Sequence, residues 1–94
     1  MGGKLVYGPR EFSVDCTIRD LTEAGAHLRL ASDAPLTDPI WLIVIRSGVA
    51  HHAQVAWRKP PEVGLRFDQT IDLRQHASGP LLHLHRLWVE CSER

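Results

Sequence analysis

The residues best suited to binding chemistry lie between residues 16 and 28, where Asp20, Thr22 and Gly25 follow one another at short offsets. Asp and Thr side chains in a tight connection can bond nearby backbone N–H groups and shape a turn. Gly25 is expected to supply either a positive φ or a close approach of two backbone segments. Taken alone, this pattern predicts a well-formed hairpin turn between two strands.

Arginine is the second candidate for binding chemistry, because the chain has nine Arg residues and only two Lys residues. The planar guanidinium group suits phosphates and guanine edges, so this imbalance favours a nucleotide ligand. A GC-rich genome would enrich arginine in the same way. The 11 basic and 11 acidic residues balance, so we expect no general attraction to nucleic acid polymers or to an anionic membrane.

Metal and catalytic chemistry fit the sequence poorly. His51 and His52 are adjacent, and a strand points adjacent side chains to opposite faces. His83 and His85 are not spaced as a chelating pair on a helix. Cys16 falls on an apolar strand face, where a thiol is unreactive. We therefore predict that the chain is not an enzyme, has no catalytic residues and holds neither a metal nor a resident cofactor.

The elements that must position these residues are strands, because apolar residues recur with period two over most of the chain. The pattern predicts strands near residues 4–7, 12–20, 25–30, 40–46, 50–58 and 62–67, with turn-forming residues between them. No helical crossover separates one strand from the next. Six short antiparallel strands predict a closed barrel, because closure removes exposed sheet edges.

The predicted strand at residues 40–46 is apolar on both faces, so its outer face needs a lid. A helix at about residues 79–91 can supply that lid, after a Gly-Pro helix start. Its apolar stripe has residues at spacings of three and four: Leu81, Leu84, Trp88 and Cys91. We assign the three tryptophans, Trp41, Trp57 and Trp88, to the core and to helix packing.

Ninety-four residues make one domain, so residues 1–94 are interpreted as a single all-β unit. The barrel is expected over about residues 4–67, a polar connection over 68–78 and the helix over 79–91. No signal peptide and no long apolar run is recognised in the sequence, and Cys16 and Cys91 form no paired motif. The expected compartment is the cytoplasm.

Residues 20–26, Asp-Leu-Thr-Glu-Ala-Gly-Ala, resemble the (D/N)xSxxGA motif of PilZ domains, with Thr22 at the serine position. Residues 55–58, Val-Ala-Trp-Arg, and 63–67, Val-Gly-Leu-Arg-Phe, resemble the fifth and sixth strands of that family. The resemblance covers about residues 4–70, and the helix by position. It implies a PilZ-type six-stranded antiparallel β-barrel with one C-terminal α-helix.

PilZ domains are typically receptors for cyclic di-GMP, so the resemblance implies a receptor or adaptor in bacterial second-messenger signalling. By the family pattern, Asp20 would accept from a guanine edge, the Thr22 hydroxyl would contact the base, and Gly25 would admit the ligand closely. Alternation points four arginines outward, where they could offer phosphate contacts: Arg19, Arg29, Arg58 and Arg66. Three of them are taken as candidate binding residues: Arg19, Arg29 and Arg66.

The sequence departs from the family at the RxxxR motif, whose two arginines clamp the ligand. That motif should precede Lys4, where the chain has Met1-Gly2-Gly3. Either the natural protein lacks the clamp, or the sequence as given starts downstream of it. Losing two charge-assisted contacts of about 1.5–3 kcal/mol each would weaken binding by a few orders of magnitude.

The competing hypothesis is a degenerate PilZ module that binds no nucleotide and acts through protein–protein contacts. We expect a protein partner under either hypothesis. The oligomeric state stays open, because three leucines could leave apolar surface on the helix: Leu81, Leu82 and Leu87.

Overall fold

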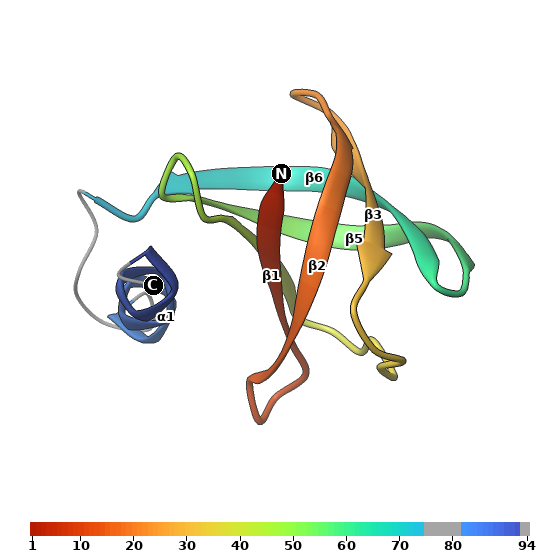
Figure 1. Cartoon of the computed structure of the whole chain (residues 1–94), viewed down its shortest axis with the longest axis horizontal. Coiled ribbons are helices and arrows are strands. Elements are labelled where there is room, and N and C mark those ends of the chain that lie inside the picture. The colour runs from red at the N-terminus through yellow and green to blue at the C-terminus, as the bar shows by residue number, and fades with distance from the viewer. Residues whose placement is uncertain (75–81, 93–94) are drawn as a thin grey trace.

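The computed structural model of the chain describes residues 1–74 and 82–92, and these form a closed antiparallel barrel with one helix beside it (Figure 1). The strands pair in the order β1-β2-β3-β6-β5-β4, which returns to β1. This confirms the predicted fold class. The elements are β1 (Gly2–Tyr7), β2 (Phe12–Leu21), β3 (Gly25–Leu30), β4 (Ile40–Val44), β5 (Val49–Lys59), β6 (Glu62–Asp72) and α1 (Leu82–Ser92).

The barrel interior is filled by one side of every strand. Leu5, Leu28, Leu42 and Val63 come from four different strands and are completely buried in one cluster. Because side chains alternate between the two faces of a strand, this cluster fixes which residues point outward. In β3, His27 and Arg29 therefore lie on the outer surface, next to the buried Ala26, Leu28 and Leu30.

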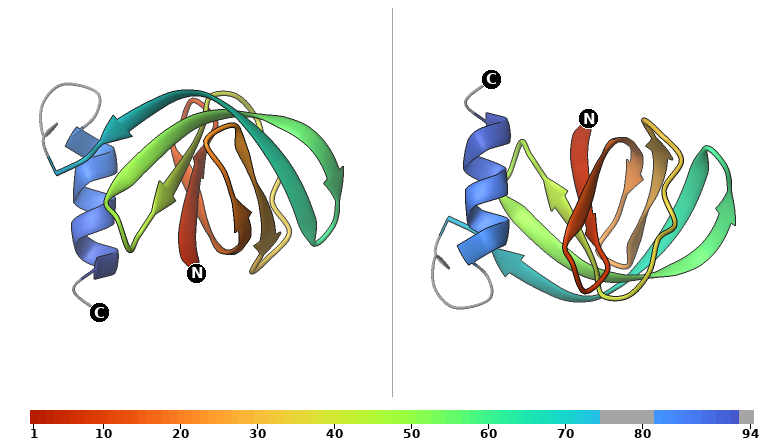
Figure 2. Two further views of the ribbon diagram at one scale, coloured as in Figure 1. Left: turned by 90° about the horizontal axis from the view of Figure 1, so that it is seen from above. Right: turned by 90° about the horizontal axis from the view of Figure 1, so that it is seen from below.

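The outer face of β4 is covered by α1, as its two-sided apolar pattern predicted. Ile43 is fully buried in a second cluster with Leu84 of α1, which is 4% exposed. Trp88 packs against this cluster and donates a hydrogen bond of 2.8 Å from Nε1 to the Ile45 carbonyl oxygen. Figure 2 shows α1 beside the end of the barrel where β5 begins and β6 ends. No described helix is long and apolar enough to cross a membrane.

The boundaries differ from those predicted at both ends of the barrel. β1 begins at Gly2 rather than at Lys4, because Gly2 and Gly3 pair with residues of β2. β6 continues to Asp72, so the first part of the predicted connection at 68–78 is strand. Its polar residues stay extended because they pair with β5 rather than because they are buried. The predicted start of the helix at residue 79 lies outside the described residues.

The second half of β5 does not follow the predicted alternation. Register shifts against β6 occur between His52 and Ala53 and between Val55 and Trp57. The extra residue of the first shift is Asp68 in β6, and that of the second is Ala56 in β5. An extra residue in a strand moves the residues after it to the other face. Trp57 is consequently 46% exposed, and its assignment to the core was wrong. The other two tryptophans pack where α1 meets the barrel, as predicted: Trp41 from β4 and Trp88 from α1.

Candidate functional site

The turn between β2 and β3 is built around the Thr22 hydroxyl. Its Oγ1 accepts hydrogen bonds from the backbone N–H groups of Ala24, at 3.2 Å, and Gly25, at 3.1 Å. The same hydroxyl donates to the Gly25 carbonyl oxygen at 3.2 Å. The backbone N–H of Thr22 also donates to that carbonyl, at 2.9 Å. Thr22 therefore shapes the turn, and its donor and both acceptor positions are occupied.

Gly25 is required by a close approach of two strands. A Cβ atom at this position would lie 2.1 Å from the carbonyl oxygen of Leu65 in β6. Two residues further along β6, the backbone N–H of Phe67 donates to the Ala24 carbonyl oxygen at 2.8 Å. The turn is thus held directly on β6, and of the two roles predicted for Gly25 the close approach is the one observed.

A row of four residues crosses the outer face next to this turn. Asp20 in β2 pairs with His27 in β3, His27 pairs with Gly64 in β6, and Gly64 pairs with Trp57 in β5. A Cβ atom on Gly64 would lie 2.0 Å from the indole Nε1 of Trp57. The Trp57 ring therefore lies across the Gly64 backbone, where a larger residue would displace it.

The Trp57 ring also contacts His27. The two ring centroids are 5.2 Å apart in an edge-on arrangement with an interplanar angle of 62°. His27 is held in turn by Glu62, because His27 Nε2 lies 2.8 Å from Glu62 Oε1. These contacts fix an exposed aromatic ring on the barrel surface.

Asp20 stands at the other end of the same row. It is exposed, and its carboxylate makes no hydrogen bond or ion pair with any other residue in the described part of the chain. β3 and β6 lie between this carboxylate and the exposed indole of Trp57, whose ring reaches back over Gly64. A carboxylate in this position can accept hydrogen bonds from a planar heterocycle that rests on the ring.

The structure brings two of the three candidate arginines to this end of the barrel. Arg19 is the extra residue of a bulge in β2, since Ile18 pairs with Leu28 and Asp20 pairs with His27. Arg66 pairs with Gly25, and its Nη2 donates to Gln54 Oε1 at 3.0 Å. Both are exposed. Arg29 lies at the opposite end of β3 and lines a pocket there, so the structure does not group it with the turn.

The residues that could support other chemistry are placed differently. Cys16 is buried in the barrel, and burial, together with the charge of Asp15, raises the pKa of its thiol to about 12. Such a thiol is a poor nucleophile at neutral pH. Among residues 1–74 and 82–92, no group of three or more His, Cys, Asp and Glu side chains is arranged to hold a metal ion.

Sequence reasoning identified the turn but missed the aromatic half of the site. His27 and Trp57 were not selected, because Trp57 was expected to point inward. Gly64 was the available signal, since a glycine inside a strand marks close approach of another group. The site as a whole is an exposed surface across four strands, with a carboxylate at one end and an indole at the other, on a domain of the closed β-barrel class.

The comparisons with known proteins agree with this class. Residues 4–79 match the PilZ domain family. The match covers most of the chain, so the chain belongs to the PilZ family. The family is of the cyclic di-GMP-binding type, and its members are binding or adaptor domains rather than enzymes. No curated protein and no solved structure matches the chain.

Proposed function

We propose that the chain is a cyclic di-GMP receptor or adaptor that binds one guanine over the outer face of β2, β3, β6 and β5. The observation that carries this proposal is the row from Asp20 to Trp57, which presents an unpaired carboxylate and an exposed indole beside the family turn. Guanine offers a flat ring for stacking and N–H donors on one edge. Stacking on Trp57 and hydrogen bonding to Asp20 use both features.

The phosphates of the ligand would meet Arg19 and Arg66, the two exposed arginines at this end of the barrel. Arg66 is available for this role because its present partner, Gln54, is uncharged. A charge-assisted bond to phosphate is roughly twice as strong as a neutral one. Thr22 and Gly25 act indirectly in this proposal, by holding the turn on β6.

Binding by this face alone is expected to be weak, because Met1, Gly2 and Gly3 offer no arginine for the family's clamp. We infer that such a clamp would act from the start of β1. The Ile18 backbone N–H donates to the Met1 carbonyl at 2.7 Å, so the start of β1 lies beside the residues that lead to Asp20. A segment placed ahead of Met1 would reach the same face.

Calorimetric titration of the chain with cyclic di-GMP tests the proposal. Asp20→Ala removes the unpaired carboxylate without breaking any described bond, and Trp57→Ala removes the stacking ring. Glu90→Ala on α1 is the matched control, since Glu90 is an exposed carboxylate away from the site. We expect binding that both site variants abolish and the control preserves.

A chain extended by an Arg-Xaa-Xaa-Xaa-Arg segment ahead of Met1 provides the second arm. The receptor proposal requires this extension to tighten binding by a few orders of magnitude, for two contacts of about 1.5–3 kcal/mol each. The second candidate function is the module that acts through protein contacts alone. The absence of binding both in the chain and in its extended form would favour that module and refute the receptor.

A further inference from the structure

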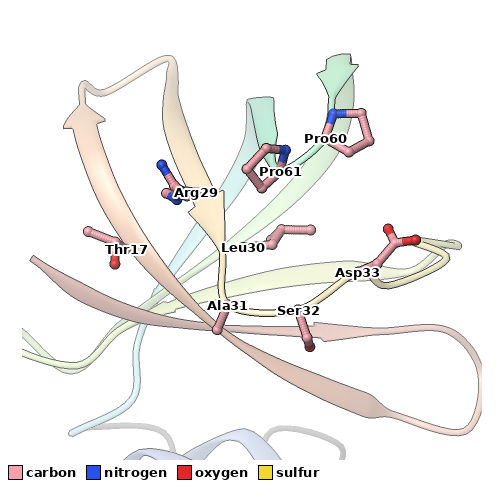
Figure 3. Close-up of a pocket in the computed structure, with 8 residues that line it drawn as sticks. All are labelled: Thr17, Arg29, Leu30, Ala31, Ser32, Asp33, Pro60 and Pro61. Carbon is pink, nitrogen blue, oxygen red and sulfur yellow. The ribbon is translucent and has the colours of Figure 1, made fainter.

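A separate pocket of about 610 Å³ lies at the opposite end of β3 from the turn (Figure 3). Its volume is within the range of about 300–1,000 Å³ that is usual for small-molecule sites. It is formed by β2, the end of β3 with the residues after it, and the connection between β5 and β6. Six lining residues matter here: Thr17, Arg29, Ser32, Asp33, Pro60 and Pro61.

Arg29 places a guanidinium group in this pocket. Its Cα partner in β6 is Glu62, which would be the natural carboxylate for an ion pair. Instead, Glu62 Oε1 lies 2.8 Å from His27 Nε2. Over the described residues, no carboxylate comes within ion-pair distance of Arg29. Figure 3 shows the Arg29 side chain between Thr17 of the neighbouring strand and Pro61 of the hairpin.

The carboxylate on the pocket rim is already neutralised. Arg58 Nη2 donates to Asp33 Oδ1 at 2.9 Å, and the same guanidinium group bonds the Ala34 carbonyl. The hydroxyls of Thr17 and Ser32 make no hydrogen bond to other described residues. Within residues 1–74 and 82–92, the pocket therefore presents a guanidinium group and two hydroxyls without partners, and its one carboxylate is paired.

The pocket walls are fixed by backbone hydrogen bonds. The Leu30 N–H donates to the Pro61 carbonyl at 2.8 Å, which ties the β5–β6 connection to β3. The Ala31 N–H donates to the Asp15 carbonyl at 2.9 Å, which ties the pocket floor to β2. Pro60 and Pro61 form a rigid apolar wall, so little ordering is needed when a ligand enters.

We propose that this pocket binds a small organic oxyanion. A carboxylate or phosphate group would sit on the Arg29 guanidinium, which matches such groups with two parallel N–H bonds. The Thr17 and Ser32 hydroxyls would donate to the same oxyanion. The ring or apolar body of the ligand would rest on Pro60 and Pro61. The pocket is distinct from the proposed cyclic di-GMP face, and its ligand is independent of that function.

Amide chemical shifts of the labelled protein during titration with benzoate and with adenosine 5′-monophosphate test this proposal. These probes carry a carboxylate and a phosphate, respectively, and neither contains guanine. Adenosine and inorganic phosphate, each with half of the required chemistry, are the controls. We expect both organic oxyanions, or one of them, to shift the amides of Thr17, Arg29, Ser32 and Asp33 at lower concentration than either control.

Arg29→Gln should weaken this binding by roughly tenfold or more. Arg10→Gln is the matched control, because Arg10 is exposed in the turn between β1 and β2 and does not line the pocket. Asp20→Ala should leave pocket binding unchanged while it abolishes cyclic di-GMP binding, so the two proposals can fail separately. The pocket proposal is overturned if no organic oxyanion shifts these amides at millimolar concentration, or if Arg29→Gln and Arg10→Gln titrate alike.

Discussion

Replacement of Gly25 by alanine tests whether the contact between the turn and β6 holds the site together. The new Cβ would lie 2.1 Å from the Leu65 carbonyl oxygen, and a backbone atom cannot move without disturbing the pairing of β3 with β6. Overpacking of this kind costs about 1–3 kcal/mol. Gly2 gives the matched control, because a Cβ there meets nothing within 4 Å.

Without a clash, alanine should stabilise a strand over glycine by about 0.5–1 kcal/mol, since glycine loses more backbone entropy on folding. The free energies of unfolding of Gly25→Ala and Gly2→Ala should therefore differ by about 1.5–4 kcal/mol. Urea denaturation followed by circular dichroism measures this difference, and each kcal/mol corresponds to about 4–8 °C in Tm for a domain of this size. Equal unfolding midpoints for the two variants would refute the close-approach argument.

Three further predictions concern the thiols, the buried histidine and the helix. Burial raises the pKa of Cys16 to about 12, so Cys16 should resist alkylation in the folded protein while the partly exposed Cys91 reacts. Mass spectrometry of labelled peptides measures this, and equal labelling of the two cysteines would contradict it. Burial lowers the pKa of His51 below 6.5, so below pH 6.5 the unfolded state binds more protons and stability should fall as the pH falls. Because one proton is involved, the contribution of His51 to the slope is at most about 1.4 kcal/mol per pH unit and ends below its folded-state pKa, and His51→Asn should remove it in pH-dependent urea denaturation. Leu84→Ala should lower the free energy of unfolding by about 2–5 kcal/mol in the same assay. Arg86→Ala, on the exposed side of α1, should lower it little. If Leu84→Ala costs as little as Arg86→Ala, the packing of α1 does not stabilise the barrel.

Much of the fold could be predicted because one physical signal dominates it. Apolar residues alternate with polar ones in most strands, and only a closed barrel buries six such faces without leaving an edge. The strand at residues 40–46 breaks this alternation, which was enough to predict a helix on its outer face. The turn at residues 20–25 was predictable because Asp, Thr and Gly have local backbone roles.

The aromatic half of the site was not predicted, because Gly64 marks a close approach without saying which residue approaches, and bulges carry little sequence signal. The shift between Val55 and Trp57 is one residue long, yet it reverses the face of Trp57. The bulge at Arg19 likewise places Asp20 opposite His27, whereas strict alternation would separate them onto different faces. A rule of period two therefore describes the core and fails where the site is built.

His27 lies between the proposed guanine face and the pocket, and its contacts affect both. It contacts Trp57 on one side and holds Glu62 on the other, so that Arg29 has no ion-pair partner in the part of the chain that the structure describes. Since Glu62 and Arg29 are directly opposite in the pairing of β3 with β6, removal of the imidazole should release Glu62 to pair with Arg29. His27→Ala should then weaken oxyanion binding although His27 does not line the pocket. The double variant with Glu62→Gln should restore that binding, because the competing carboxylate is gone. If the double variant binds oxyanions no better than His27→Ala in the amide-shift titration, pairing with Glu62 does not determine whether Arg29 can bind an oxyanion.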